Sequence, residues 1–284
     1  TLYGEELVRS WYGAKSKETP PRNFQERIVQ WYINYHAKNL FEGKDNVKID
    51  TPVLPISYPQ HSAGQVDKVA ARLKSAQKPV MLVGSGAMMN GKKAEALAKA
   101  ISKLGIPVYL SGMGRGLLGK ENNLQMRHHR KDAIKEADLI LLAGVPNDFR
   151  LDYGNHIGGR PFISINRSKE DLNKNKTPTI GIHADPQDFL IALAEKFQGN
   201  YSGWIENLRA RDAKREANID AQAAGEVQGI NPIKLFRDLE PQLDDNTILV
   251  ADGGDFVATS AYTLRPRAPL SWLDPGVFGT LGVG

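Results

Sequence analysis

The chain contains no cysteine and no long apolar run. The absence of cysteine excludes disulfide bonds, thiolate catalysis and zinc sites with cysteine ligands, and it fits a reducing intracellular compartment. No apolar stretch approaches the ~20 residues that a membrane-spanning helix needs. The first residues, TLYGEELVRSWYG, lack the charged-then-apolar pattern of a signal peptide. The sequence in hand therefore predicts no membrane segment of its own.

Several catalytic signatures are missing as well. The sequence has no HExxH, GxSxG or P-loop motif, which argues against the common zinc peptidases, serine hydrolases and P-loop nucleotidases. His128 and His129 lie within RHHRK. A zinc site needs ligands that converge at suitable spacing, so we interpret this run as a solvated basic face.

The remaining composition is that of a globular protein. Of the 284 residues, 41% are hydrophobic and 24% charged, with a formal net charge of +5. This length suits one large domain or two ordinary ones. The modest positive charge favours anionic ligands such as nucleotides and CoA. The absence of a zinc-finger or RNA-recognition signature argues against a nucleic-acid partner.

The first sixty residues are predicted to contain one helix with a linker on each side. Residues 14–27 are polar and include Pro-Pro, and residues 51–60 are rich in turn-forming residues. Between them, residues 23–41 have apolar and aromatic side chains near helical spacing. We interpret the aromatic stripe as a packing face rather than a ligand box. Its members are Phe24, Ile28, Trp31, Tyr32 and Tyr35.

The middle of the chain alternates between strands and helices. Continuous apolar strands separated by helices indicate a parallel sheet covered on both faces. The sequence thus predicts an α/β fold with a doubly wound parallel sheet over residues 60–198. The predicted strands are 79–84, 106–111, 138–144, 160–166 and 179–183, and the predicted helices are 64–76, 92–105, 130–137 and 185–197.

A second α/β domain is predicted to begin near residue 230. A charged helical stretch, 202–222, precedes it. The next predicted helix, 231–243, has Asn231 as its cap and Pro232 in its first turn. A strand ending in the glycine turn of DGGDF follows. Only one βα unit of this domain is present.

The turn after the first strand, VGSGAMM, is a candidate nucleotide-binding loop. Gly84, Ser85 and Gly86 would let a phosphate approach backbone amides. The dinucleotide fingerprint fails, however, because its third glycine would fall at Met89 and no acid ends the second strand. The pattern argues against NAD and leaves two readings open, a tight turn or a site for another nucleotide.

Polar residues follow other predicted strands. Arg115, in SGMGRGLLG, could pair with a phosphate or be an exposed side chain. Asn166 could hold a ribose hydroxyl, and Arg167 could face an adenine or a phosphate. Asp185 is either a further polar ligand or the cap of the helix that begins at Pro186. These positions predict a ligand crevice at the carboxyl edge of the sheet.

The C-terminal sequence carries a resemblance to a known family. VADGGDFVATSAYTLRPRAPLSWLDPGVFGTLGVG resembles the opening of the diphosphate-binding domain of thiamine diphosphate enzymes, in particular the acetolactate synthase-like 2-hydroxyacyl-CoA lyases. KPVMLVGSGA, GMGRGLLG, ADLILLAG and DFRLDYG are similar to the central domain of that family. The family has pyrimidine-binding, central and diphosphate-binding domains. The resemblance implies a pyrimidine-domain tail and linker at 1–23, a helix and linker at 24–59, the central domain at 60–198, a linker at 199–229, and the truncated start of the diphosphate-binding domain at 230–284.

The resemblance assigns cofactor roles to two glycine-rich stretches. Gly253 and Gly254 would approach the diphosphate of thiamine diphosphate, whereas Asp255 replaces the Asn or His of several relatives. An anion beside a diphosphate is unfavourable unless it is paired. Gly279 would offer its carbonyl to the aminopyrimidine, and Leu281 would be the apolar wedge between the two rings. The chain itself is expected to hold no catalytic residue and no Mg²⁺ ligand.

The activity that the resemblance implies is a carbon–carbon lyase dependent on thiamine diphosphate and Mg²⁺. It would cleave 2-hydroxyacyl-CoA to formyl-CoA and an aldehyde one carbon shorter. The activating glutamate and the Mg²⁺ ligands would lie outside the chain, so the chain alone would be inactive. The resemblance also implies a homo-oligomer, dimer or tetramer, at the endoplasmic reticulum membrane, anchored by a segment absent here.

Other functions stay open at this point. Acetolactate synthase and 2-oxo acid decarboxylase belong to the same family, and motifs of the central domain do not separate them from the lyase. A non-catalytic nucleotide-binding module would use the same doubly wound sheet. The central domain could bind ADP, FAD or no nucleotide.

Overall fold

The computed structural model describes residues 5–13, 20–43 and 58–282, which fall into two compact units divided after Ile56. The first unit contains helices α1 (Glu5–Trp11) and α2 (Phe24–Phe41). Asn23 caps α2 by accepting a hydrogen bond from the amide of Glu26. The buried residues of α2 are Ile33 and Ala37, whereas all five members of the aromatic stripe are exposed. Within this unit the stripe therefore does not form the predicted packing face.

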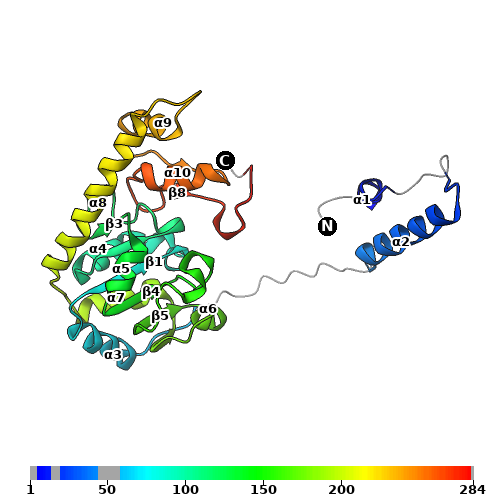
Figure 1. Ribbon diagram of the computed structural model, residues 1–284. Helices are drawn as coiled ribbons and strands as arrows, with labels where there is room; N and C mark the ends of the chain where they lie inside the picture. Colours follow the sequence, from blue (N-terminus) through cyan, green and yellow to red (C-terminus); the bar gives the residue numbers. More distant parts are fainter. Residues whose placement is uncertain (1–4, 14–19, 44–57, 283–284) are drawn as a thin grey trace. The chain divides into compact units, whose positions relative to one another are not determined.

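The second unit is built on a six-stranded sheet in which every neighbouring pair is parallel (Figure 1). Its strand order is β3-β2-β1-β4-β5-β6, with the order reversing between β1 and β4. The predicted doubly wound fold is confirmed, and we call residues 58–198 the sheet domain. The strands are β1 (Pro79–Val83), β2 (Val108–Leu110), β3 (Gln125–Met126), β4 (Leu139–Ala143), β5 (Phe162–Asn166) and β6 (Ile180–His183). The helices of this domain are α3 (Ala63–Lys74), α4 (Ala94–Leu104), α5 (Arg130–Glu136), α6 (Lys169–Asn173) and α7 (Pro186–Lys196).

Burial on both faces explains why the central strands β1 and β4 are apolar throughout. Successive strand side chains point to opposite faces. Met81 and Val83 therefore pack in one cluster with α3, α4 and α7, whereas Val80 and Leu82 pack in the other with α5. The strand that the sequence did not predict, β3, has two residues, too few for any periodicity to show.

The stretch predicted as a linker, 199–229, contains the long helix α8 (Ser202–Ala223), which leads from the sheet domain to α9 (Figure 1). Trp204 and Leu208 are buried in the same cluster as α5. The indole of Trp204 also donates a hydrogen bond to the Pro79 carbonyl at 3.1 Å. The helix is thus packed on the sheet domain along its first turns rather than being a free connection.

Residues 230–282, here called the C-terminal segment, form a small α/β layer. It contains α9 (Pro232–Leu239), β7 (Leu249–Val250), α10 (Asp255–Thr263) and β8 (Trp272–Leu273), and the two strands are parallel. Asn231 caps α9 by accepting from the amides of Ile233 and Lys234, as predicted. The small core of the segment consists of Leu249, Ala251, Leu264 and Trp272.

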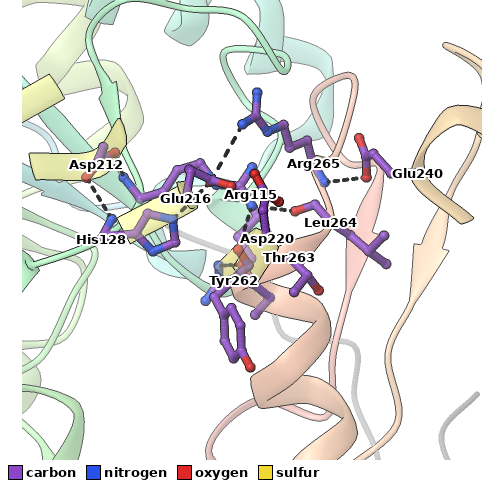
Figure 2. A network of polar contacts seen from close by, with 12 residues as sticks. Arg115, His128, Asp212, Glu216, Asp220, Glu240, Tyr262, Thr263, Leu264 and Arg265 are labelled. Carbon is purple, nitrogen blue, oxygen red and sulfur yellow. Dashed lines mark hydrogen bonds and ion pairs between the residues drawn. The ribbon is translucent and has the colours of Figure 1, made fainter. Parts of the chain in front are cut away.

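A buried ionic network holds the C-terminal segment on the sheet domain (Figure 2). Glu216 of α8 lies 3.0 Å from His128 Nε2 and 2.5 Å from Arg237 of α9. Arg265 and Arg127 lie 3.6 and 3.8 Å from the same carboxylate. One acid of α8 therefore connects cationic side chains from three parts of the chain.

The network corrects one expectation from the sequence. His128 was predicted to lie on a solvated basic face, but it is 8% exposed, and its backbone amide donates to Asp212. His129 stays exposed and pairs with Asp132. The prediction was wrong for His128 because its acid partners come from α8, more than eighty residues later.

The network also sets the charge state of Glu216. Burial alone would raise the pKa of its carboxyl. The hydrogen bonds from His128 and Arg237, together with the charges of Arg127 and Arg265, outweigh burial and lower the pKa to about 2. A depressed carboxyl pKa contributes stability above its usual value of 4.5, and that stability is lost as pH falls from 4.5 towards 2.

We predict that Glu216→Gln destabilises the chain at pH 7 by roughly 2 kcal/mol, because it removes the carboxylate from the partly buried Arg127 and Arg265, while Arg237 keeps Asp220 at 2.9 Å. The difference from the unsubstituted chain should shrink as pH falls from 4.5 towards 2. Urea unfolding at pH 7, 4.5 and 3 measures this, with Glu206→Gln, an exposed acid of the same helix, as control. Equal sensitivity of both variants to pH would contradict the assignment.

Candidate functional site

A crevice lies at the carboxyl edge of the sheet, where the strand order reverses between β1 and β4. Open α/β sheets bind ligands at this position. The cavity has a volume of about 720 Å³ and brings together four residues that the sequence predicted for a nucleotide. These are Gly84, Ser85, Gly86 and Asn166, and the loop at Pro275–Gly276 and Phe278 of the C-terminal segment closes one side.

The glycines of the crevice are required by the packing of the chain itself. A Cβ added to Gly84 would lie 2.8 Å from the Gly144 carbonyl oxygen, and one on Gly86 would lie 2.8 Å from the Gly144 Cα. Gly144, with φ of +63°, would place a Cβ 2.4 Å from the amide nitrogen of Ala87. The two loops after β1 and β4 therefore touch backbone to backbone. This contact accounts for Gly84 and Gly86 without a ligand.

The polar groups of the crevice are largely engaged within the chain. Ser85 Oγ accepts from the Met113 amide at 3.1 Å, and Asn166 Oδ1 accepts from the Ser168 amide at 3.2 Å. Its two cations are matched by two acids, with Arg150 paired to Asp148 at 2.6 Å and Lys174 to Asp171 at 3.7 Å. The crevice is roomy but carries no excess of positive charge.

Three of the predicted nucleotide residues, Arg115, Arg167 and Asp185, lie outside the crevice lining. Arg167 stacks on the ring of Tyr58, 3.9 Å from its centroid, and pairs with Asp185 at 3.6 Å. Asp185 caps α7 by accepting from the amides of Gln187 and Asp188. The cap reading of Asp185 is confirmed.

Arg115 faces away from the crevice, towards the C-terminal segment. Its guanidinium donates to the Ala261 carbonyl at 3.1 Å and lies 5.5 Å from the centre of the Trp272 ring. Burial lowers the pKa of its guanidinium. Arg115 therefore joins the two layers and lines a second cavity.

That second cavity, here called the arginine cleft, was missed by the sequence analysis. It has a volume of about 360 Å³ and lies between the β2–β3 edge, the RHHRK loop and residues 261–266. The sequence carried two signals, Arg115, predicted as a possible phosphate partner, and the basic run, interpreted as a solvated face. It could not bring them together, because the apposed residues 261–266 come from far along the chain. The charged and titratable lining residues are Tyr109, Arg115, Arg127, His129, Arg130, Lys131 and His156.

The two stretches predicted to hold thiamine diphosphate lie against each other. A Cβ on Gly253 would be 2.5 Å from the Gly279 carbonyl oxygen and 2.8 Å from that of Thr280. The Asp252 carboxylate accepts from the amide of Gly282 at 2.9 Å. The DGGDF turn and the closing FGTLG loop are thus packed together, although about 25 residues separate them.

The backbone at the start of α10 is suited to binding a diphosphate group. Gly254, at φ of +72°, is the N-cap residue and makes no side-chain cap bond, and nothing lies within 4 Å of its Cβ position. Helix N-terminal amides favour anions. Asp255 occupies the first turn, where its exposed carboxylate stabilises the helix dipole. Its side chain therefore has a local role that needs no cofactor.

The predicted wedge residue is not used for packing within the described chain. Leu281 is 71% exposed and Phe278 is 89% exposed, while Gly279 has φ of +58°. The apolar side chains of Phe278 and Leu281 are therefore available to contact a ligand or a further part of the protein.

Among residues 5–13, 20–43 and 58–282, no group of three or more His, Asp or Glu side chains is arranged to hold a metal ion. None of the helices in these ranges combines the length and apolar character needed to span a bilayer.

Comparison with known proteins gives the family. The profile described as "Thiamine pyrophosphate enzyme, central domain" matches residues 66–193. The chain is 40% identical to 2-hydroxyacyl-CoA lyase 2 of Danio rerio over 100% of its own length and 46% of that protein, and 41% identical to that of Homo sapiens over 93% and 43%. It is 30% identical to a probable acetolactate synthase of Mycobacterium bovis over 80% and 41%. The chain thus spans less than half the length of these relatives, and it belongs to the thiamine pyrophosphate enzyme family, with the central domain at residues 66–193.

Proposed function

We propose that this chain is part of a carbon–carbon lyase that depends on thiamine diphosphate and Mg²⁺. Its reaction would cleave a 2-hydroxyacyl-CoA to formyl-CoA and an aldehyde shortened by one carbon. The observation that carries the proposal is the contact of Gly253 with the carbonyls of Gly279 and Thr280. It joins the two stretches that the family resemblance assigns to the two ends of the cofactor.

Different residues would contact different parts of the cofactor. Backbone amides at the start of α10 would meet the diphosphate, the Gly279 carbonyl would accept a hydrogen bond from the aminopyrimidine, and Leu281 would support the bend between the rings. Thiamine diphosphate supplies a nucleophilic carbon and an electron sink when it is bound. Mg²⁺ would bridge the diphosphate through oxygen ligands.

The lyase is favoured over acetolactate synthase or a 2-oxo acid decarboxylase by degree of similarity. Relatives named 2-hydroxyacyl-CoA lyase 2 are 40% identical over the whole chain, compared with 30% over 80% of it for the probable acetolactate synthase. The proposal includes an acyl-CoA substrate, a homo-oligomeric whole protein and a location at the endoplasmic reticulum membrane, which rest on the family resemblance.

We predict that the 284-residue chain with thiamine diphosphate and Mg²⁺ has no lyase activity. The chain covers 46% of a related lyase, and the family resemblance places the activating glutamate and the metal ligands outside residues 1–284. The assay follows formyl-CoA release from a 2-hydroxyacyl-CoA, with a longer protein containing the missing elements as positive control. Turnover by the chain alone would contradict the three-domain assignment.

We predict that Leu281→Ala in the whole enzyme slows hydrogen–deuterium exchange at C2 of the bound cofactor more than it weakens cofactor binding. Its loss removes apolar contact with the cofactor worth ~2–3 kcal/mol if that contact is fully buried, and each ~1.4 kcal/mol is a tenfold change. Because Leu281 is 71% exposed, the substitution should leave the melting temperature of the chain unchanged.

Leu235→Ala, at a leucine of α9 that is 52% exposed, is the matched control and should leave exchange unchanged. An exchange rate that Leu281→Ala leaves at the unsubstituted value would remove Leu281 from the cofactor site.

A second function, nucleotide binding in the crevice, is favoured by its volume of about 720 Å³ at the switch point. We expect weak binding of ADP, CoA or FAD, since the crevice has no excess positive charge. Titration calorimetry measures it, and Lys174→Gln should weaken binding, whereas Lys169→Gln, outside the lining, should not. No heat with all three ligands would show that the crevice is not a nucleotide site.

A further inference from the structure

The arginine cleft concentrates positive charge without any acid in its lining. Arg115, Arg127, Arg130 and Lys131 line it with two histidines, and no Asp or Glu is among the lining residues. The crevice differs in this respect, because its two cations are matched by Asp148 and Asp171. The two cavities share no lining residue.

The arginines are held in place by neutral carbonyls. Arg115 donates to Ala261, Arg127 donates to Tyr262 and Leu264, and Arg130 donates to Arg150. Among the described residues, Arg127 is the one of these three arginines that forms an ion pair, with Glu216 at 3.8 Å from Nε, and that acid also serves His128 and Arg237. The guanidinium groups are therefore positioned but not neutralised.

Several buried polar atoms of the cleft make no hydrogen bond. Tyr109 is 3% exposed, yet its hydroxyl has no partner. The Nε atoms of Arg115 and Arg127, Nδ1 of His156 and Oε1 of Gln125 are also buried and unbonded. Unsatisfied buried donors cost about 1–3 kcal/mol each, and rotation of the Gln125 amide would add a further donor. These unbonded donors could all be satisfied by a ligand in the cleft that carries several hydrogen-bond acceptors.

The pKa values of the arginines also favour a bound anion, because burial and neighbouring cations both disfavour their charged form. Burial lowers the pKa of Arg115 and of Arg130, and burial and the charge of Arg265 lower the pKa of Arg127 to about 10. Burial raises the pKa of Tyr109, so its phenol stays a neutral donor. An anion in the cleft would relieve the repulsion and accept from these groups.

We propose that the arginine cleft binds a phosphoryl or pyrophosphoryl group, with Arg115, Arg130 and the Tyr109 hydroxyl as donors. Planar guanidinium groups match the oxygens of phosphate in pairs. Because Arg115 and Arg127 also hold residues 261–264, the bound anion stabilises the contact between the sheet domain and the C-terminal segment. This site does not depend on thiamine chemistry and is separate from the crevice.

The test is the sign of a stability change in Tyr109→Phe. The substitution keeps the ring and removes only the unpartnered hydroxyl. Without anion, the melting temperature should therefore stay the same or rise. In the unsubstituted chain, 5–10 mM sodium pyrophosphate should raise it, and Tyr109→Phe should lose most of that rise, with affinity falling roughly tenfold as for a lost charge-assisted bond.

Tyr201→Phe is the matched control. Its hydroxyl donates to the Leu73 carbonyl at 3.1 Å and lies outside the cleft. It should lower the melting temperature without anion and leave the response to pyrophosphate intact. Arg130→Gln should weaken pyrophosphate binding in calorimetry, whereas Lys174→Gln, in the crevice, should not.

Parallel titrations with inorganic phosphate, pyrophosphate, ADP and CoA separate the sources of the group. Binding of the inorganic anions supports free phosphate or pyrophosphate as the ligand. If only ADP or CoA binds, and the binding depends on Tyr109, the ligand is a phosphoryl group that belongs to a nucleotide or to CoA. No binding of any of the four, or binding that Tyr109→Phe and Arg130→Gln leave unchanged, would overturn the proposal.

Discussion

The carboxylate of Glu216 is the contact on which the arrangement of the second unit depends. It meets His128 and Arg127 of the sheet domain and Arg237 and Arg265 of the C-terminal segment. Helix α8 carries this acid between the two layers and is itself fastened by Trp204. A buried charge is costly to leave unpaired, so the alternatives to this arrangement are unfavourable. The docked segment then forms one wall of the arginine cleft and one side of the crevice.

The glycines at the carboxyl edge of the sheet show that a binding motif can also be a packing requirement. Gly84, Gly86 and Gly144 bring two loops into backbone contact. The same closeness leaves an open crevice beside them, lined by side chains whose charges already balance. The excess positive charge lies instead in the arginine cleft, beside β2 and β3. The distribution of charge thus separates a switch-point crevice suited to weakly held ligands from a cleft suited to anions.

The two halves of the proposed thiamine diphosphate site are joined by close backbone contact. Gly253 is in contact with Gly279 and Thr280, and Asp252 accepts from the Gly282 amide. A movement of either stretch would therefore displace the other. Leu281, which the family resemblance predicts as the ring-supporting side chain, follows this contact directly in the chain and is exposed.

The sequence by itself determined the class of fold and most of the helices and strands. Apolar strands such as 79–83 and 139–143 are visible because both of their faces are buried, and Asn231 and Asp185 are visible as caps because capping is local. It also showed the glycine turns and, through resemblance, the family. The tertiary structure alone decided the short strand β3, the burial of His128, the direction of Arg115 and the arginine cleft. Each of these depends on groups that lie far apart in the chain, such as Glu216 for His128 and Ala261 for Arg115, and no local pattern encodes such pairings.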